Sequence, residues 1–308
     1  IRMKVVYGHT DSIYVKIEDV EKAEQVCEDL DSHVQSLFPN PLGLDPHPVS
    51  LEFEKFYKSL GVGCTKNRNA GFISWKDGEW LAEPEFVVTG FSMKRITETK
   101  LGREVQETVL KMWANEKTEQ EIVQYCQQKY NDVMDGKLPL TDVVNRSRVR
   151  ANRMNVKLSC GHINSFEELM ENGGNCKHII QDEYTGEERQ CMGADPKTLE
   201  GKQPSIGSGI LGVLFYNSLH PDNKIDDSYV YVKVKNVNKK FFHPLKHELI
   251  SPNYVSAHEI KELEQYEIDW LHYANVVVKK ATPVFKAMGW QIKQIERDLK
   301  QKTLEDWF

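Results

Sequence analysis

Tyr7-Gly8-His9-Thr10-Asp11-Ser12 is the stretch on which the interpretation of this sequence depends. Residues with strand character flank it on both sides. Because Gly8 and Asp11 are turn residues, the pattern predicts a tight hairpin with its tip at residues 8–10. An acid held at such a tip by rigid strands can hold a divalent metal ion against a substrate phosphate. An Asp beside a glycine-containing turn is also a common turn residue, so the residues alone leave both interpretations open.

The composition is that of a water-soluble globular protein. The chain has 308 residues, 28% of them charged, and a mean hydropathy of −0.55. This length suffices for one large or two ordinary domains, and no apolar run approaches the roughly 20 residues that span a bilayer, so no membrane partner is expected. The net charge of −6 argues weakly against nucleic-acid binding, but such binding needs basic residues only along one groove. Because the chain begins inside a strand pattern, we expect a piece of a longer protein.

The first ninety residues mix strands with one helix. Apolar spacing predicts a helix from Val20 to Phe38. Alternation from Val49 predicts a half-buried strand with Glu52 and Glu54 on its exposed face. A hairpin is expected over residues 70–81. The order is that of an α+β layer.

Beyond Gly90 the pattern becomes mainly helical. The predicted helices and strand lie at 96–113, 118–136, 257–288 and 228–234. Thr118 and Ser256, each followed three residues later by Glu, have the form of capping boxes that open two of these helices. The arginine-rich stretch 142–157 is expected to be partly helical. The polar segment from about 158 to 209 shows no clear pattern.

The opening hexapeptide resembles the Y-G-D-T-D-S signature of family B DNA polymerases, with His9 in place of the first Asp. Two further stretches are similar to family motifs in the same order. Residues 51–58 resemble its L-E-x-E-x-x-Y-K strand, and 65–70 resemble its K-K-R-Y region, with Asn67 and Asn69 replacing the second Lys and the Tyr. The resemblance covers most of the chain apart from the Cys/His segment.

This resemblance implies an archaeal-type polymerase portion of class α+β. An antiparallel palm sheet with packed helices would occupy residues 1–90, and a mainly helical thumb 91–300. Asp11 would bind Mg²⁺ in a two-metal site, with Glu54 as an auxiliary acid and His9 beside it. The resemblance implies primer-template DNA and deoxynucleoside triphosphates as substrates. It also implies a place in the cytoplasm, in the replisome of an archaeon or in a virus-infected host.

The family's second main aspartate, its nucleotide-binding helix and its exonuclease domain have no counterpart in these residues. We therefore expect activity to require a large N-terminal polymerase fragment or subunit. An imidazole at His9 cannot supply the anionic oxygen that Mg²⁺ prefers. Either His9 does not touch the metal and is tolerated, or the active site is weakened. The second possibility suggests an alternative function, a catalytically inactive accessory protein that binds DNA and the clamp.

Eight basic residues are candidates for the DNA-gripping surface: Lys66, Arg68, Lys94, Arg95, Arg146, Arg148, Arg150 and Arg153. Such residues contact phosphates and set register rather than sequence choice. For any one of them a solvated charged surface is the alternative.

Two further segments suggest binding sites. Five potential zinc ligands fall within the polar insertion: Cys160, His162, Cys176, His178 and Cys191. Four would make a structural zinc site, a disulfide or an unmetallated loop being the alternatives. The last eight residues, 301–308, resemble the box that binds sliding clamps, with Gln301 as the polar residue and Leu304, Trp307 and Phe308 as an apolar plug. The alternative is that these aromatic residues pack back on the thumb.

Overall fold

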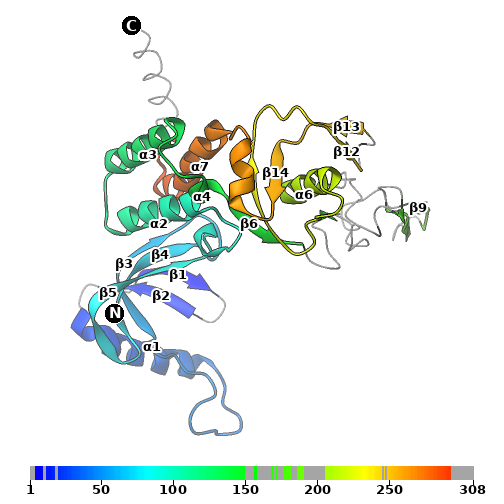
Figure 1. Cartoon of the computed structure of the whole chain (residues 1–308). Coiled ribbons are helices and arrows are strands. Elements are labelled where there is room, and N and C mark those ends of the chain that lie inside the picture. The colour runs from blue at the N-terminus through cyan, green and yellow to red at the C-terminus, as the bar shows by residue number, and fades with distance from the viewer. Residues whose placement is uncertain are drawn as a thin grey trace. The chain divides into compact units, whose positions relative to one another are not determined.

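The structure is a computed structural model that describes residues 4–9, 12–17, 20–149, 156–157, 168, 171–172, 176–181, 186–190, 205–244, 246 and 248–292. The chain divides into two compact units. Unit 1 consists of residues 1–91, 108–122 and 282–292. Unit 2 consists of residues 92–107, 123–281 and 293–308. Figure 1 labels many of the helices and strands.

Unit 1 opens with a hairpin and a helix. Strands β1 (Lys4–His9) and β2 (Ser12–Lys16) pair antiparallel. A short 3₁₀ helix, η1 (Val20–Lys22), leads into α1 (Ala23–Leu37), which confirms the helix predicted there.

The strand predicted from Val49 is wrong. Residues 49–54 alternate between half-buried and exposed, as expected, but they are not part of a strand. The Leu51 N–H donates to Asp31 Oδ1 of α1, and the Cys27 thiol of α1 lies 3.9 Å from the Leu51 carbonyl. These contacts bind the extended segment to a helix rather than to another strand. The sheet begins only at Lys55.

A three-stranded antiparallel sheet forms the centre of unit 1. Its strands, in spatial order, are β3 (Lys55–Val62), β4 (Asn69–Lys76) and β5 (Glu79–Thr89). Asp77 and Gly78 connect the last two with φ angles of 55° and 88°, as a two-residue hairpin turn requires. The predicted hairpin over 70–81 is therefore confirmed.

The end of helix α2 (Lys100–Ala114) covers this sheet. The indole of Trp113 lies so close to Gly61 of β3 that a Cβ there would sit 2.6 Å from the ring. Lys111 Nζ lies 5.4 Å from the ring centroid of Phe86 on β5. A side chain at position 61 would therefore push the helix off the sheet.

The two helices after Gly90 begin where side chains cap them. Thr99 Oγ1 accepts the Gly102 N–H at 3.0 Å, so α2 starts later than the predicted residue 96. A short 3₁₀ helix, η2 (Ser92–Lys94), precedes it. Helix α3 (Glu119–Met134) has the predicted capping box. It stops just before Gly136, the predicted stop residue, whose φ is 67°.

The core of unit 2 is a sheet with one helix beside it. The strand order is β14 (Tyr254–Ala257), β11 (Ser228–Lys233) and β6 (Asn145–Arg148), all antiparallel. Helix α6 (Ser208–Leu219) lies beside β14 (Figure 1). Gly209 and Gly212 permit this approach, and the Ser256 hydroxyl donates to the Gly209 carbonyl at 2.8 Å. The strand predicted at 228–234 is thus confirmed.

The structure of unit 2 differs from the sequence prediction in two places. In the stretch 142–157, which was expected to be partly helical, the first two residues end the short helix α4 (Leu140–Val143), and residues 145–148 form a strand that pairs with β11. Ser256 opens no helix, because its hydroxyl bonds to α6 and its backbone stays in β14. The capping box there belongs to Glu259 and Glu262, which start the 3₁₀ helix η3 (Ile260–Gln265).

The last helix, α7 (Trp270–Met288), begins later than predicted and ends as predicted at Gly289, whose φ is 73°. Short antiparallel pairs complete the described part of unit 2: β7 (Val156–Lys157) with β10 (Ser205–Ile206), β8 (Ile179–Gln181) with β9 (Glu188–Gln190), and β12 (Phe241–His243) with β13 (Glu248–Ile250). Every strand pairing among the described residues is antiparallel, so the fold class is α+β. Among these residues no helix has the length and apolar character needed to cross a membrane.

Candidate functional site

The hairpin β1–β2 carries the stretch that resembles the polymerase signature. Gly8 pairs with Ile13, and His9 pairs with Ser12. Gly8 and His9, which were predicted to lie at the hairpin tip, therefore belong to strand β1. The two residues that join the strands, Thr10 and Asp11, lie outside the described residues, as does the side chain of His9.

The tyrosine face of the hairpin is attached to a loop sixty residues away in the sequence. The Tyr7 hydroxyl accepts the backbone N–H of Asn67 at 3.1 Å and donates to Asn67 Oδ1 at 3.3 Å. The ring of Tyr14, on the paired strand, lies with its centroid 5.3 Å from that of Tyr7 and 6.0 Å from that of Tyr57 on β3. The hairpin is thereby positioned against both the loop and the sheet.

The loop between β3 and β4 carries the basic residues matched to the family's K-K-R-Y region. The Gly63 N–H donates to the Arg68 carbonyl at 2.7 Å, which closes the loop. Asn67 has a φ of 59°, and Gly90 approaches its carbonyl so closely that a Cβ at position 90 would overlap it. Lys66 is exposed, and Arg68 lies 6.0 Å from the ring centroid of Phe91. A loop held at so many points can present basic side chains in fixed positions.

Glu54 ends the extended segment in front of β3. Its side chain is 66% exposed and lies 2.5 Å from Lys55 Nζ. Burial raises the pKa of the Tyr57 phenol, and the neighbouring Tyr14 and the charge of Glu54 raise it further. Glu54 therefore lies near the same tyrosine that packs against the hairpin.

Basic residues of unit 2 lie on two separate elements. Lys94 and Arg95 are exposed at the end of η2. Gln106 holds this turn, because its Oε1 accepts the Ser92 hydroxyl at 3.0 Å and the Met93 N–H at 2.8 Å. The turn is thus fixed although its basic side chains are free to meet solvent.

Arg146 and Arg148 are exposed on one face of the edge strand β6. A strand, rather than the expected helix, puts residues two apart on the same side. Arg150 and Arg153 lie outside the described residues.

The candidate zinc ligands are only partly described. Cys176 is buried, and its carbonyl accepts the Gln190 side-chain amide at 3.2 Å, whereas His178 is exposed. Cys160, His162 and Cys191 lie outside the described residues. Within the described part of the chain no group of three or more His, Cys, Asp or Glu side chains is placed to hold a metal ion. The clamp-box residues Gln301, Leu304, Trp307 and Phe308 are also outside it.

Comparison with known proteins identifies the family. The profile of DNA polymerase family B matches residues 1–184, which is more than half of the 308-residue chain. The chain belongs to DNA polymerase family B. This family B chain has no match among the curated proteins searched.

Among solved structures, the chain is similar to the family B DNA polymerase from the hyperthermophilic archaeon Pyrobaculum calidifontis, at 17% sequence identity and a TM-score of 0.48. The match covers 91% of this family B chain and 26% of the Pyrobaculum chain. The chain thus spans about a quarter of the length of that polymerase.

The sequence interpretation missed the residues that fix the hairpin and loop. Neither Tyr7 nor Asn67 was expected to bond to the other, and the buried Gln106 had no predicted role. The available signal was Gly63 at the start of the basic loop and Gly90 after β5, because glycine often marks a close approach of two backbone segments.

Proposed function

We propose that this chain is the C-terminal palm and thumb portion of a replicative, archaeal-type family B DNA polymerase. Residues 1–90 supply the palm end, and 91–300 the thumb. In this proposal Asp11 binds Mg²⁺ directly and Glu54 is an auxiliary acid near the metal. Two such ions activate the primer 3′-hydroxyl and stabilise the leaving pyrophosphate.

The observation that best supports this proposal is the attachment of Tyr7 to Asn67. Tyr7 lies on the strand that leads to Asp11, and Asn67 lies between Lys66 and Arg68. A polymerase needs its metal-binding acid and its hold on the primer terminus in fixed relation, because misplacement of reacting atoms by about 1 Å can cost a hundredfold in rate. A hydrogen-bonded link between the two segments meets this need.

The second main aspartate and the nucleotide-binding residues would come from a large N-terminal fragment or subunit. We also propose a structural Zn²⁺ held by four of Cys160, His162, Cys176, His178 and Cys191. The buried Cys176 fits a structural ligand, and metal analysis of the purified chain tests the assignment.

The DNA-gripping role is tested by the salt dependence of primer-template binding. Each phosphate contact contributes a slope of about −0.9 to a plot of log affinity against log salt concentration for duplex DNA. The double variant Arg146→Ala/Arg148→Ala should lower the magnitude of the slope by about 2. The control, Lys224→Ala, changes one exposed lysine that is not among the proposed DNA contacts and should leave the slope unchanged. Equal slopes for the double variant and the unchanged chain would reject these arginines as DNA contacts.

One residue favours the second candidate, a catalytically inactive protein that binds DNA and the clamp. His9 stands where the family signature has an acid, and its imidazole is a poor ligand for Mg²⁺. In the enzyme reassembled with an N-terminal part, His9→Asp should raise turnover with Mg²⁺ if His9 weakens the site. A variant that stays as active as the original would instead show that His9 is tolerated, and no extension by either would favour the accessory function.

A further inference from the structure

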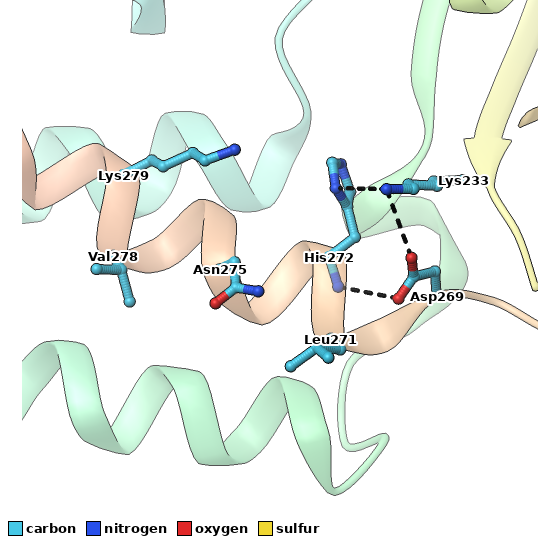
Figure 2. Close-up of a pocket in the computed structure, with 7 residues that line it drawn as sticks. All are labelled: Lys233, Asp269, Leu271, His272, Asn275, Val278 and Lys279. Carbon is cyan, nitrogen blue, oxygen red and sulfur yellow. Dashed lines mark hydrogen bonds and ion pairs between the residues drawn. The ribbon is translucent and has the colours of Figure 1, made fainter. Parts of the chain in front are cut away.

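A cavity of about 400 Å³ lies in unit 2, where β11 ends and α7 begins (Figure 2). Five polar side chains line it: Lys233, Asp269, His272, Asn275 and Lys279. Its volume falls within the range of about 300–1,000 Å³ that is typical of ligand sites. No residue of this cavity belongs to the β1–β2 hairpin, to the loop between β3 and β4 or to strand β6.

The backbone around the cavity is fixed on both sides. The backbone N–H of Lys233 donates to the Tyr273 hydroxyl at 2.8 Å, and the backbone N–H of Asp269 donates to the Lys233 carbonyl at 3.1 Å. The Tyr273 side chain is only 2% exposed. The backbone positions from which the Lys233 and Asp269 side chains extend are therefore fixed.

Positive charge exceeds negative charge in the cavity. Lys233 Nζ lies 3.6 Å from Asp269 Oδ2 and 3.4 Å from His272 Nδ1, both longer than the roughly 2.7–2.9 Å of a strong charge-assisted hydrogen bond. The other carboxylate oxygen of Asp269, Oδ1, accepts the backbone N–H of His272 at 3.1 Å. Asp269 thereby caps the N-terminus of α7. Lys279, seven residues along the same helix, has no hydrogen bond or ion pair within the part of the chain that the structure describes. Among the described residues, one ammonium group of the cavity thus has no counter-charge.

Figure 2 shows Lys233 and Lys279 reaching toward His272 from opposite sides. Burial lowers the pKa of this imidazole, and the charges of Lys233 and Lys279 lower it further, while Asp269 acts in the opposite direction. The rings of Tyr254 and Tyr273 lie edge-on to it, with centroids 6.3 and 5.0 Å away. The imidazole is therefore neutral near pH 7.

The protonation of the ring follows from its neighbour. An ammonium group can only donate, so Nδ1, which faces Lys233, is the acceptor and Nε2 carries the proton. A neutral N–H donor between two ammonium groups suits an anion with several oxygens, and the amide of Asn275 adds another donor at the rim.

We propose that this cavity binds a phosphate group of a nucleic-acid backbone. Lys233 and Lys279 supply the charge, and His272 Nε2 and Asn275 supply neutral hydrogen bonds. The choice of nucleic acid as the source of the phosphate rests on the proposed polymerase function. A contact there would add a fixed anchor for the duplex in unit 2, apart from the arginines of β6.

The first arm of the test uses inorganic phosphate and the full chain. Phosphate should raise the pKa of His272 by about one unit, read by NMR titration of the imidazole, because an adjacent anion favours the charged ring. Lys279→Ala should weaken phosphate binding about tenfold. Lys279→Arg should restore most of the affinity, since it keeps the charge. Lys261→Ala, at an exposed lysine of η3 outside the cavity, is the matched control.

The second arm uses a DNA duplex. Lys279→Ala should lower the magnitude of the salt slope of duplex binding by about 1, and Lys261→Ala should leave it unchanged. An unshifted His272 in phosphate, or equal duplex slopes for Lys279→Ala and the unchanged chain, would overturn the proposal. Binding of the duplex by the unchanged chain is measured in the same series. If it persists while the cavity variants have no effect, only this site is rejected and the polymerase function stands.

Discussion

The Tyr7 hydroxyl and the Asn67 backbone are joined by a 3.1 Å hydrogen bond, and a second bond of 3.3 Å runs from the same hydroxyl to the Asn67 side chain. One tyrosine thereby ties the hairpin to the loop that carries Lys66 and Arg68. In the resemblance to the K-K-R-Y region, Asn67 replaces the second lysine.

Tyr7→Phe removes both hydrogen bonds and keeps the ring that packs on Tyr14. Because a net hydrogen bond contributes about 0.5–1.5 kcal/mol, we expect a loss of about 1 kcal/mol in the free energy of unfolding. The amide of Asn67 should also exchange its hydrogen faster. Tyr130→Phe is the control, because the Tyr130 hydroxyl makes no hydrogen bond within the described residues. Unchanged exchange at Asn67 in Tyr7→Phe would show that this link does not hold the loop.

Gly90→Ala should destabilise the chain more than Gly78→Ala. Both glycines have positive φ, 74° and 88°, so each alanine costs about 1–2 kcal/mol of backbone strain. Only at position 90 would the new Cβ overlap the Asn67 carbonyl oxygen, whereas position 78 faces open space. Denaturant unfolding of the two variants measures the difference. Equal losses would mean that the loop moves aside freely.

The start of α3 should weaken in acid. The Glu121 carboxylate pairs with Lys117 and accepts hydrogen bonds from Thr118, which lowers its pKa from 4.5 to about 2. The folded pKa lies below the unfolded one, so this stabilisation is complete above pH 4.5 and is lost as the pH falls toward about 2. Glu121→Gln should therefore reduce the acid dependence of the free energy of unfolding over this interval. Parallel curves for the variant and the unchanged chain would contradict the assignment.

The fold was predictable where the signal was local. The Thr118 capping box and the turn at Asp77 and Gly78 depend on neighbours within three residues, and both were found as expected. The failures came from partners distant in the sequence. Leu51 bonds to α1 instead of a strand, and Ser256 bonds to Gly209 instead of capping a helix.

The same distinction applies to the candidate site. The hairpin strands could be placed from the sequence, because strand character flanks a turn-forming stretch, whereas the residues of the basic loop were matched only by resemblance. Their connection through Tyr7 and Asn67 spans sixty residues, and no periodicity or capping signal reports it. The cavity at Lys233 and Lys279 was missed for the same reason, since the two lysines come from different elements.

Removal of residues 301–308 should abolish the stimulation of primer extension by a sliding clamp and spare extension of short primers without a clamp. In this prediction Leu304, Trp307 and Phe308 would fill an apolar pocket on the clamp, and such buried aromatic anchors carry most of the binding energy of an interface. Replacing Gln301 alone should weaken the stimulation less than removing the aromatic pair. Full stimulation of the truncated enzyme would mean that the tail serves another purpose.

The central claim is that Asp11 binds the catalytic metal in an enzyme completed by an N-terminal part. Its most direct test is primer extension with Mg²⁺ by the chain combined with a polypeptide that carries the upstream aspartate and nucleotide-binding helix, comparing Asp11 with Asp11→Asn. The account predicts extension by the combination, none by either part alone, and a loss of at least about a thousandfold in Asp11→Asn with primer-template affinity retained. Extension that survives Asp11→Asn would contradict the account.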